Sequence, residues 1–340
     1  MGAFFMSDLR DRLRKLESSL KTTRVVPVDD DKVDLFAKLE FENPNGSSKD
    51  RAAFWILKRG IERGDITEGT TVLESSSGNF AISMASFCHT LGIRFVPVID
   101  PNCNTSTEAY LRSRCERVEK VTTRDRTGGY LRTRLQRVQE IRQELDRCYW
   151  PNQYSNDDAL EANYRLTGEE IVGSFSSLDY LFVGVGTGGT ISGLSRRLKE
   201  AFPDIRVIAV DAAGSAVFGQ HPKVRRIPGI GSSIVPPLVG KAIIDDIVIV
   251  PERQAADGCR QLLRRSGIHA GGSTGSMYAA IQHYFTQRPV SGPPPSVLFI
   301  CADRGAGYTE TVYNNAWVAE FLSTGEGFTI KTMTAPASAG

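Results

Sequence analysis

The sequence lacks the patterns that build metal centres and disulfide frameworks. Its 340 residues include four histidines and six cysteines, and no two cysteines form a C-x-x-C pair. The histidines show no spacing typical of metal ligands; they are His89, His221, His269 and His283. We therefore expect no metal site. Scattered cysteines without a secretory signal indicate a reducing compartment, so the expected location is cytoplasmic.

Two further absences narrow the class of protein. The formal net charge is only +2, which gives no reason to expect a nucleic-acid partner. No apolar run approaches the ~20 residues that cross a bilayer, and the opening MGAFFMSDLR has no basic segment typical of a secretory signal. With 24% charged and 41% hydrophobic residues, the chain is expected to be an ordinary globular protein without a membrane partner.

Strand-like and helix-like segments alternate along the chain. Short apolar runs are followed by segments with helical periodicity; the runs are 71–76, 94–100, 179–186, 206–212, 245–250 and 296–303. Such alternation predicts parallel sheets covered by helices on both faces. The expected fold class is α/β, and a length of 340 residues indicates roughly two domains.

Local signals mark several helix ends. The helix that follows Asn79 is predicted to end at Gly92, as a glycine C-cap does. Thr105 and Glu108 have the spacing of a capping box at the start of the next helix. Residues 128–145 have the pattern of a basic amphipathic helix.

A glycine-rich loop, GVGTGGT (184–190), stands between a buried-looking strand and a helix. Glycines there let the backbone approach a phosphate, and the helix N-terminus offers unpaired N–H groups. Gly184, Gly186 and Gly189 also match G-x-G-x-x-G, and Asp211 follows at the end of the next strand, where a ribose-binding acid stands in dinucleotide-binding folds. An NAD-dependent dehydrogenase is therefore one interpretation, although it leaves the segments around Lys49 and Asn79 unexplained.

Lys49 lies in ENPNGSSKDRAA (42–53), where a Gly-Ser-Ser turn runs into an apolar helix. One interpretation is a solvated charge at a helix start. The other is a lysine held at a fixed point because it forms a Schiff base.

Four short motifs follow one another along the chain: SSKDR (47–51), SSSGN (75–79), GTGGT (186–190) and AGGSTGS (270–276). Together they supply what pyridoxal phosphate needs, namely a lysine, a phosphate cup and partners for the ring hydroxyl and ring nitrogen. In motif order and spacing the chain resembles the cysteine synthase and cystathionine β-synthase family, which are fold type II (tryptophan synthase β-like) pyridoxal-phosphate enzymes. The resemblance covers roughly residues 20–320.

This resemblance implies a set of cofactor-binding residues. Lys49 matches the lysine that forms the internal aldimine and then moves the Cα proton, and Asn79 matches the asparagine beside the ring hydroxyl. Ser273 matches the residue that faces the pyridine nitrogen. The phosphate cup is implied to be Gly186, Thr187, Gly188, Gly189 and Thr190.

The resemblance also implies a set of substrate-binding residues. The loop that grips the substrate carboxylate matches Ser76, Ser77, Gly78 and Asn79, and NQYSN (152–156) matches a second carboxylate-side segment with Gln153 at its key position. The turn PGIG (228–231) places Gly229 near the substrate amine, and ADRGAGY (302–308) matches a strand-end motif beside the cofactor.

The partner of the pyridine nitrogen bears on the chemistry. A serine hydroxyl cannot keep that nitrogen protonated as a carboxylate does, so the cofactor is a weaker electron sink and β-elimination is favoured over transamination. Two positions depart from the family pattern. Thr23-Arg24 replaces its Thr-Pro, and Phe80 replaces the small polar residue of cysteine synthases.

Within the family, segments such as GGYLRTR (128–134) and YWPNQYSN (149–156) resemble the branch that makes 2,3-diaminopropionate for siderophores and antibiotics. The implied reaction is a β-replacement in which O-phospho-L-serine loses phosphate to give an aminoacrylate and the amine of L-glutamate then adds. Arginine suits two such anionic substrates. We therefore nominate Arg134 for substrate binding, with Arg132 as the weaker candidate, and Tyr154 as a hydrogen-bond partner.

Three other readings stay open. The first is a cysteine synthase that uses O-acetylserine and sulfide. The second is the dehydrogenase described above, and the third is a family member that binds cofactor but serves as a partner protein. The family also implies a homodimer. The expected domains are a larger cofactor-binding domain (1–47 with 156–330) and a smaller substrate-loop domain (48–155), followed by a disordered tail (331–340).

Overall fold

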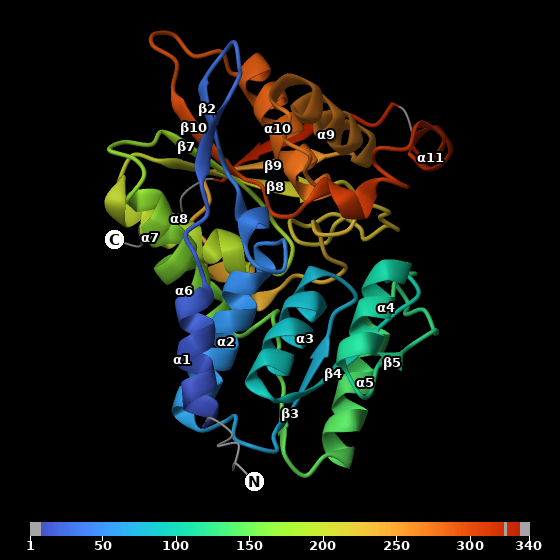
Figure 1. The fold of residues 1–340 in the computed structure, drawn as a ribbon. Coiled ribbons are helices and arrows are strands. Elements are labelled where there is room, and N and C mark those ends of the chain that lie inside the picture. The colour runs from blue at the N-terminus through green and yellow to red at the C-terminus, as the bar shows by residue number, and fades with distance from the viewer. Residues whose placement is uncertain (1–7, 323–324, 334–340) are drawn as a thin grey trace, which may run out of the picture.

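Two β-sheets organise the chain in the computed structural model, which describes residues 8–322 and 325–333 (Figure 1). The larger sheet has the strand order β1-β2-β10-β7-β8-β9-β11 and the smaller sheet has the order β5-β4-β3-β6. All neighbours are parallel except the pairs β1–β2 and β9–β11 at the two edges of the larger sheet. The predicted α/β class is confirmed.

The larger sheet is buried on both faces, as parallel sheets generally are. Its strands are β1 (Val25–Val28), β2 (Asp34–Lys38), β7 (Tyr180–Gly184), β8 (Arg206–Ala212), β9 (Asp246–Val250), β10 (Ser296–Ile300) and β11 (Thr329–Thr332). Helix α8 (Gly189–Ala201) lies on one side of the fan of strands, while α9 (Glu252–Ser266) and α10 (Gly272–Gln287) pack together on the other (Figure 1). Near-continuous apolar runs such as β9 explain this double coverage.

The smaller sheet separates two apolar cores. Its strands are β3 (Thr71–Ser75), β4 (Arg94–Ile99), β5 (Glu119–Lys120) and β6 (Cys148–Tyr149). One core joins it to α1 (Leu9–Ser19), α2 (Lys49–Arg63), α3 (Asn79–Leu91) and α4 (Thr105–Arg114), whereas α5 (Leu131–Glu144) packs on the other face. Val72 faces the first core and Leu73 the second, because successive side chains of a strand point to opposite faces.

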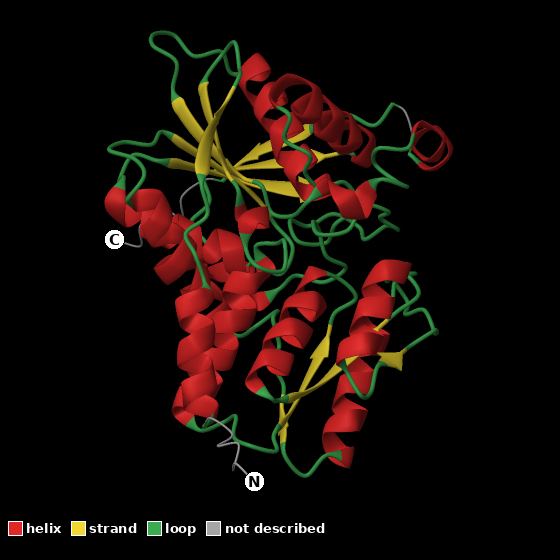
Figure 2. Cartoon of the chain, in the orientation of Figure 1, coloured by secondary structure: helices red, strands yellow, loops and turns green. Residues whose placement is uncertain are grey.

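Shorter elements connect the two sheets, and Figure 2 shows that helices and loops fill the space between them. These connecting elements are η1 (Glu40–Glu42), α6 (Asp157–Ala162), the π-helical turn η2 (Asn163–Gly168) and α7 (Glu169–Val172). Three more short elements join strands within the larger sheet: η3 (Pro237–Lys241), η4 (Gly305–Tyr308) and α11 (Asn315–Phe321). No helix of the described residues is both long and apolar enough to span a membrane.

The predicted helix end at Gly92 is confirmed, and the predicted basic helix is present with a later start. Gly92 ends α3 in the left-handed region with φ 68°, and its N–H bonds to the carbonyls of Cys88 and His89. The basic helix begins at Leu131 rather than at residue 128, because Gly128 is itself in the left-handed region with φ 78°.

The predicted capping box is wrong. Asn104 is the N-cap of α4, and Thr105 lies inside the helix. The Glu108 carboxylate pairs with Arg112 and Lys120 instead of reaching back to the cap, since two cations lie within its reach at 2.7 and 2.5 Å.

The predicted disordered tail is wrong at its first residues. Lys331 and Thr332 belong to β11, which pairs antiparallel with β9, and the N–H of Met333 bonds to the carbonyl of Asp245. Edge pairing satisfies the backbone groups of this segment despite its polar composition. The remainder of the predicted tail, 334–340, lies outside the described residues.

Candidate active site

Lys49 is the first residue of α2, and the turn before it fixes its position. Gly46 has φ 81°, which bends the chain, and Ser47 Oγ accepts the N–H of Lys49 at 3.3 Å. The Asp50 carboxylate accepts two hydrogen bonds from Asn45, one from its backbone N–H at 2.7 Å and one from its side-chain amide at 2.9 Å. These contacts brace the turn from both ends.

The amine of Lys49 is therefore aimed by backbone geometry. It lines a pocket of about 440 Å³ and makes no hydrogen bond or ion pair with the residues that the structure describes. Burial lowers the pKa of this amine, and the negative charge of Asp303 opposes the shift. A neutral amine is the form that attacks an aldehyde, so the solvated-charge interpretation does not describe this lysine.

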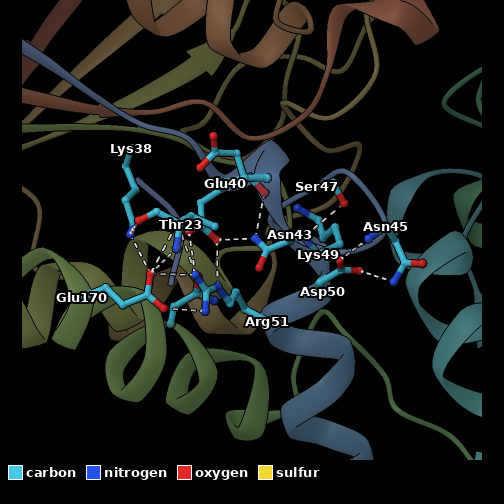
Figure 3. A network of polar contacts seen from close by, with 12 residues as sticks. Thr23, Lys38, Glu40, Asn43, Asn45, Ser47, Lys49, Asp50, Arg51 and Glu170 are labelled. Atoms are coloured by element: carbon cyan, nitrogen blue, oxygen red, sulfur yellow. Dashed lines mark hydrogen bonds and ion pairs between the residues drawn. The ribbon is translucent and has the colours of Figure 1, made fainter. Parts of the chain in front are cut away.

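A buried ion network anchors the first turn of α2 behind Lys49 (Figure 3). Arg51 pairs with Glu40 at 3.1 Å and with Glu170 at 2.7 Å, and Lys38 pairs with the same Glu170 at 2.6 Å. Thr23 donates its hydroxyl to Glu40 at 2.6 Å. The network joins β2, η1, α2 and α7, so it anchors the helix that begins with Lys49 to the framework of the larger sheet.

The segment Gly186–Thr190 follows β7 and runs into the first turn of α8, and its backbone lies close to neighbouring segments of the chain. Gly188 has φ 91°, and a Cβ there would lie 2.8 Å from the backbone nitrogen of Val239. A Cβ on Gly189 would lie 3.2 Å from the carbonyl oxygen of Ala159. Glycine is required at position 188 both by the positive φ and by the lack of space for a Cβ.

The same loop lines the Lys49 pocket at the N-terminus of α8, where helix N–H groups and the helix dipole favour an anion. A cup that side chains would fill, opposite a lysine amine whose pKa burial lowers, fits a phosphate-bearing aldehyde. The pocket includes these predicted residues: Lys49, Gly186, Thr187, Gly188, Thr190, Gly229 and Ser273.

Ser273 and Gly229 close the far side of this pocket. Ser273 lies in the first turn of α10 and is 4% exposed. Gly229 has φ 90°, and a Cβ on it would lie 3.8 Å from Ser273 Oγ and from the Tyr308 hydroxyl. The positive φ requires glycine at this position, and the turn therefore presents no side chain to this wall of the pocket.

The predicted substrate loop lies at the start of α3 and is held by its own hydroxyls. Ser76 Oγ accepts the N–H groups of Gly78 at 3.5 Å and Ala81 at 3.3 Å, so it satisfies donors of the first helical turn. Asn79 donates its amide to Asp303 at 2.8 Å. Ser76, Ser77, Gly78 and Asn79 lie beside the pocket and are not part of its lining.

Of the two nominated arginines, the structure brings Arg134 to this loop. Its Nη1 donates to Ser77 Oγ at 3.1 Å, and its Nε pairs with Asp100 at 3.1 Å. The N–H of Asp100 also donates to Ser77 Oγ, at 3.0 Å. Arg132 is exposed, and its backbone N–H bonds to Asp125.

Gln153 and Tyr154 lie on the segment before α6. Gln153 is buried, donates its amide to the carbonyl of Ser75 at 3.3 Å, and lines a second pocket of about 290 Å³ together with Lys49, Phe80 and Gly189. Burial raises the pKa of Tyr154, and the nearby charge of Arg134 opposes that shift. The structure thus places Tyr154 near Arg134.

Our reasoning from the sequence missed Glu74 and Asp303. Glu74 is the penultimate residue of β3, is fully buried, and accepts N–H groups of Ser75, Trp150 and Gln153. Burial nevertheless raises its pKa to about 7. Asp303 lies in ADRGAGY (302–308), just after strand β10, which was the available signal.

The fold and the pocket define the class, and the comparisons agree. The chain belongs to the pyridoxal-phosphate dependent enzymes, a family that it matches over residues 19–302. Two relatives are each named N-(2-amino-2-carboxyethyl)-L-glutamate synthase. The one from Cupriavidus metallidurans is 43% identical over 85% of this chain and 85% of its own. The one from Ralstonia nicotianae is 41% identical over 87% of each chain.

A solved structure supports the fold assignment. The O-acetylserine dependent cystathionine β-synthase from Helicobacter pylori superposes with a TM-score of 0.79 and 26% identity, covering 92% of this chain and all of that one. The predicted resemblance to the cysteine synthase and cystathionine β-synthase family is confirmed, as is pyridoxal phosphate as the cofactor.

The dehydrogenase reading is wrong. Asp211, which would have to bind a ribose, is fully buried, and its carboxylate accepts the N–H of its neighbour Ala212 at 2.8 Å. Burial raises its pKa to about 6. The glycines that match the dinucleotide pattern line the two pockets that contain Lys49 instead: Gly184 and Gly186 line the first, and Gly189 lines the second.

Proposed function

We propose that this chain joins L-glutamate to the three-carbon skeleton of O-phospho-L-serine, giving N-(2-amino-2-carboxyethyl)-L-glutamate and phosphate. The C–O bond to the phosphate breaks, a C–N bond to the glutamate amine forms, and the amine loses a proton. The observation that carries the proposal is the contact of Arg134 with Ser77 beside the Lys49 pocket. The names of the two relatives point to the same product.

Lys49 is the proposed catalytic residue. When bound, pyridoxal phosphate withdraws electrons from the substrate Cα and so weakens the Cα–H bond. The Lys49 amine lies in the pocket and takes that proton at Nζ. Its lowered pKa keeps a share of the amine neutral, which is the form a base requires.

Separate groups of residues are proposed to bind the phosphate and the ring of the cofactor. Gly186–Thr190 hold the phosphate with backbone N–H groups at the start of α8, and Asn79 and Ser273 meet the two polar positions of the ring. Because Ser273 offers a hydroxyl rather than a carboxylate, the site favours loss of a β-substituent over transamination.

Substrate anions are proposed to meet Ser76, Ser77, Gly78, Gln153 and Arg134. The planar guanidinium of Arg134 can donate hydrogen bonds to two anionic oxygens at once, which suits a phosphate ester. Asp100 neutralises part of that charge at 3.1 Å, so an incoming phosphate competes with this carboxylate for Arg134.

Two further features of the substrate pocket belong to the proposal. Tyr154 donates a hydrogen bond to the substrate, and Gly229 leaves room for the substrate amine. Phe80 is 2% exposed and lines the second pocket. Cysteine synthases have a small polar residue at this position, and phenylalanine cannot make the hydrogen bond of such a residue.

A cysteine synthase using O-acetylserine and sulfide is the second candidate, favoured by the likeness to a solved O-acetylserine dependent enzyme. One assay separates the two. Purified enzyme with cofactor is given O-phosphoserine or O-acetylserine, each with glutamate or sulfide. We expect that O-phosphoserine releases phosphate only when glutamate is present. The product should have the mass of N-(2-amino-2-carboxyethyl)-L-glutamate. Turnover of O-acetylserine with sulfide alone would contradict the proposal.

The assembly, the location and the domain boundaries are also proposals. We infer a homodimer in the cytoplasm, with a larger domain (1–47, 156–330) and a smaller one (48–155). All six cysteines are free thiols, which suits a reducing compartment. Helix α1 packs its leucines into the core beside the smaller sheet, so limited proteolysis should test where the first segment belongs. Sedimentation equilibrium measures the oligomeric state.

A further inference from the structure

Asp303 is a buried carboxylate with half of its hydrogen-bonding capacity unused. The residue is 6% exposed, and its Oδ2 accepts the Asn79 amide and the Tyr308 hydroxyl, each at 2.8 Å. Its other oxygen, Oδ1, is buried and has no hydrogen-bond partner among the described residues. A buried polar atom without a partner costs free energy, so its presence calls for a role.

The backbone holds this carboxylate next to the cofactor lysine. Asp303 and Ser47 form an antiparallel bridge, and the N–H of Ser48 donates to the carbonyl of Ala302 at 2.7 Å. Lys49 follows directly. Oδ1 of Asp303 occupies the space beside Gly271 that a side chain would need, because a Cβ on Gly271 would lie only 2.1 Å from it.

Among the described residues, Lys49 is the cation whose charge acts on Asp303. Burial raises the pKa of Asp303 itself, and the hydrogen bonds from Tyr308 and Asn79 and the charge of Lys49 oppose that shift. Besides Lys49, the titratable groups on which the charge of Asp303 acts are Tyr308, Tyr313, Cys259 and Cys301. Burial raises the pKa of each of these four groups, that of Cys259 to about 12, so all four are neutral near pH 7. Within the described residues, the charge of Asp303 therefore acts mainly on Lys49.

Asn79 depends on Asp303 for its orientation. A primary amide has two N–H donors, and the bond to Asp303 occupies one of them. This bond also fixes which amide atom is nitrogen, since a carboxylate only accepts. The second N–H and the carbonyl oxygen stay available for a ring substituent.

We propose that Asp303 is a positioning residue for pyridoxal phosphate. It orients the Asn79 amide toward the ring, and it supplies the negative charge that stabilises a positively charged nitrogen on Lys49, both before and after the cofactor is attached. The proposal goes beyond the proposed reaction, because it concerns cofactor binding and holds whichever substrates are used.

The test is the pH dependence of the visible absorbance of the cofactor-loaded enzyme without substrate. In Asp303→Asn the amide keeps the shape of the side chain but removes its charge. The attached Lys49 nitrogen then loses its counter-charge, so its pKa should fall by roughly one unit or more. The titration midpoint moves to lower pH by that amount. A midpoint equal to that of the wild type overturns the proposal.

Tyr308→Phe is the matched control. It removes one donor to Asp303 and leaves the carboxylate in place, so the midpoint should stay within about half a unit of the wild-type value. An equal shift in both variants would mean that disturbed packing, not lost charge, moves the titration, and would overturn the proposal.

The orienting role is measured separately, as the dissociation constant of pyridoxal phosphate from the cofactor-free protein. Asn79→Ala should weaken binding about tenfold, the equivalent of roughly one hydrogen bond to a charged group, and leave the midpoint in place. Asp303→Asn should change both quantities. If Asp303→Asn does not fold, Asp303→Ser removes the same charge with a smaller side chain, and the titration midpoint of this variant should shift to lower pH by the same amount. An unchanged midpoint in that variant also overturns the proposal.

Discussion

Arg134 and Ser77 are 57 residues apart in sequence and share a hydrogen bond of 3.1 Å between Nη1 and Oγ. The contact brings α5 to the loop that starts α3. It therefore couples the proposed anion-binding arginine to the proposed carboxylate-binding loop, so one substrate can engage both.

We predict that Arg134→Gln raises the KM for O-phosphoserine by roughly 10- to 100-fold, because a phosphate loses its bidentate cation. Steady-state phosphate release measures this. Arg132→Gln is the matched control on the same helix and should change KM less than twofold, since Arg132 is exposed. Equal losses in the two variants would show that general positive charge, rather than Arg134, attracts the substrate.

Lys49→Ala should abolish product formation and remove the visible absorbance that arises from a covalent bond to the cofactor. The physical reason is that no other amine lines the pocket among the described residues. Mass spectrometry after borohydride reduction should find the cofactor on Lys49 in the wild type and on no residue of the variant. Retained activity would contradict the proposed mechanism.

Gly188→Ala should destabilise the phosphate cup and weaken cofactor binding strongly. The new Cβ would lie 2.8 Å from the backbone nitrogen of Val239, at φ 91°, and we expect a loss of about 1–3 kcal/mol or more in stability. Gly240→Ala is the control, because a Cβ there meets nothing within 4 Å. Thermal melting and cofactor titration of both variants check the prediction.

Arg51→Leu should cost about 3–5 kcal/mol in the free energy of unfolding, because Glu40 would stay buried without its partner. Urea denaturation measures the change. Arg59→Ala removes an exposed ion pair with Glu62 from the same helix and should change stability by under about 1 kcal/mol. A loss of similar size in both variants would refute the role given to the buried network.

Glu74 should make the protein less stable as pH rises. Burial raises its pKa to about 7 in the folded state from an ordinary value of 4.5, so the folded protein holds this proton more tightly. The contribution is fully present below pH 4.5 and is lost as pH rises through about 7, which amounts to roughly 3 kcal/mol. Glu74→Gln removes this dependence. The stability of the wild type minus that of the variant should therefore fall by about this amount between pH 4.5 and pH 8. A constant difference would mean that Glu74 is ionised throughout.

Much of the site could be predicted because its parts are local. The turn before Lys49 and the glycines after β7 depend on neighbouring residues, so the sequence marks both. The partners of the buried charged residues could not be predicted from neighbouring residues in the sequence. Asp303 reaches Asn79 across 224 positions and Arg51 reaches Glu170 across 119, and no periodicity records such contacts. The capping box failed for the same reason, because Lys120 reaches Glu108 from another element.

By itself the sequence determined the α/β class, the alternation of strands and helices, and the chemical types gathered in the four motifs, because hydrophobic period and turn chemistry are short-range properties. The tertiary structure alone decided which carboxylates meet which cations, and which lysine amine is desolvated. Burial and the distance between charges set those outcomes, and both depend on segments that only the fold brings together.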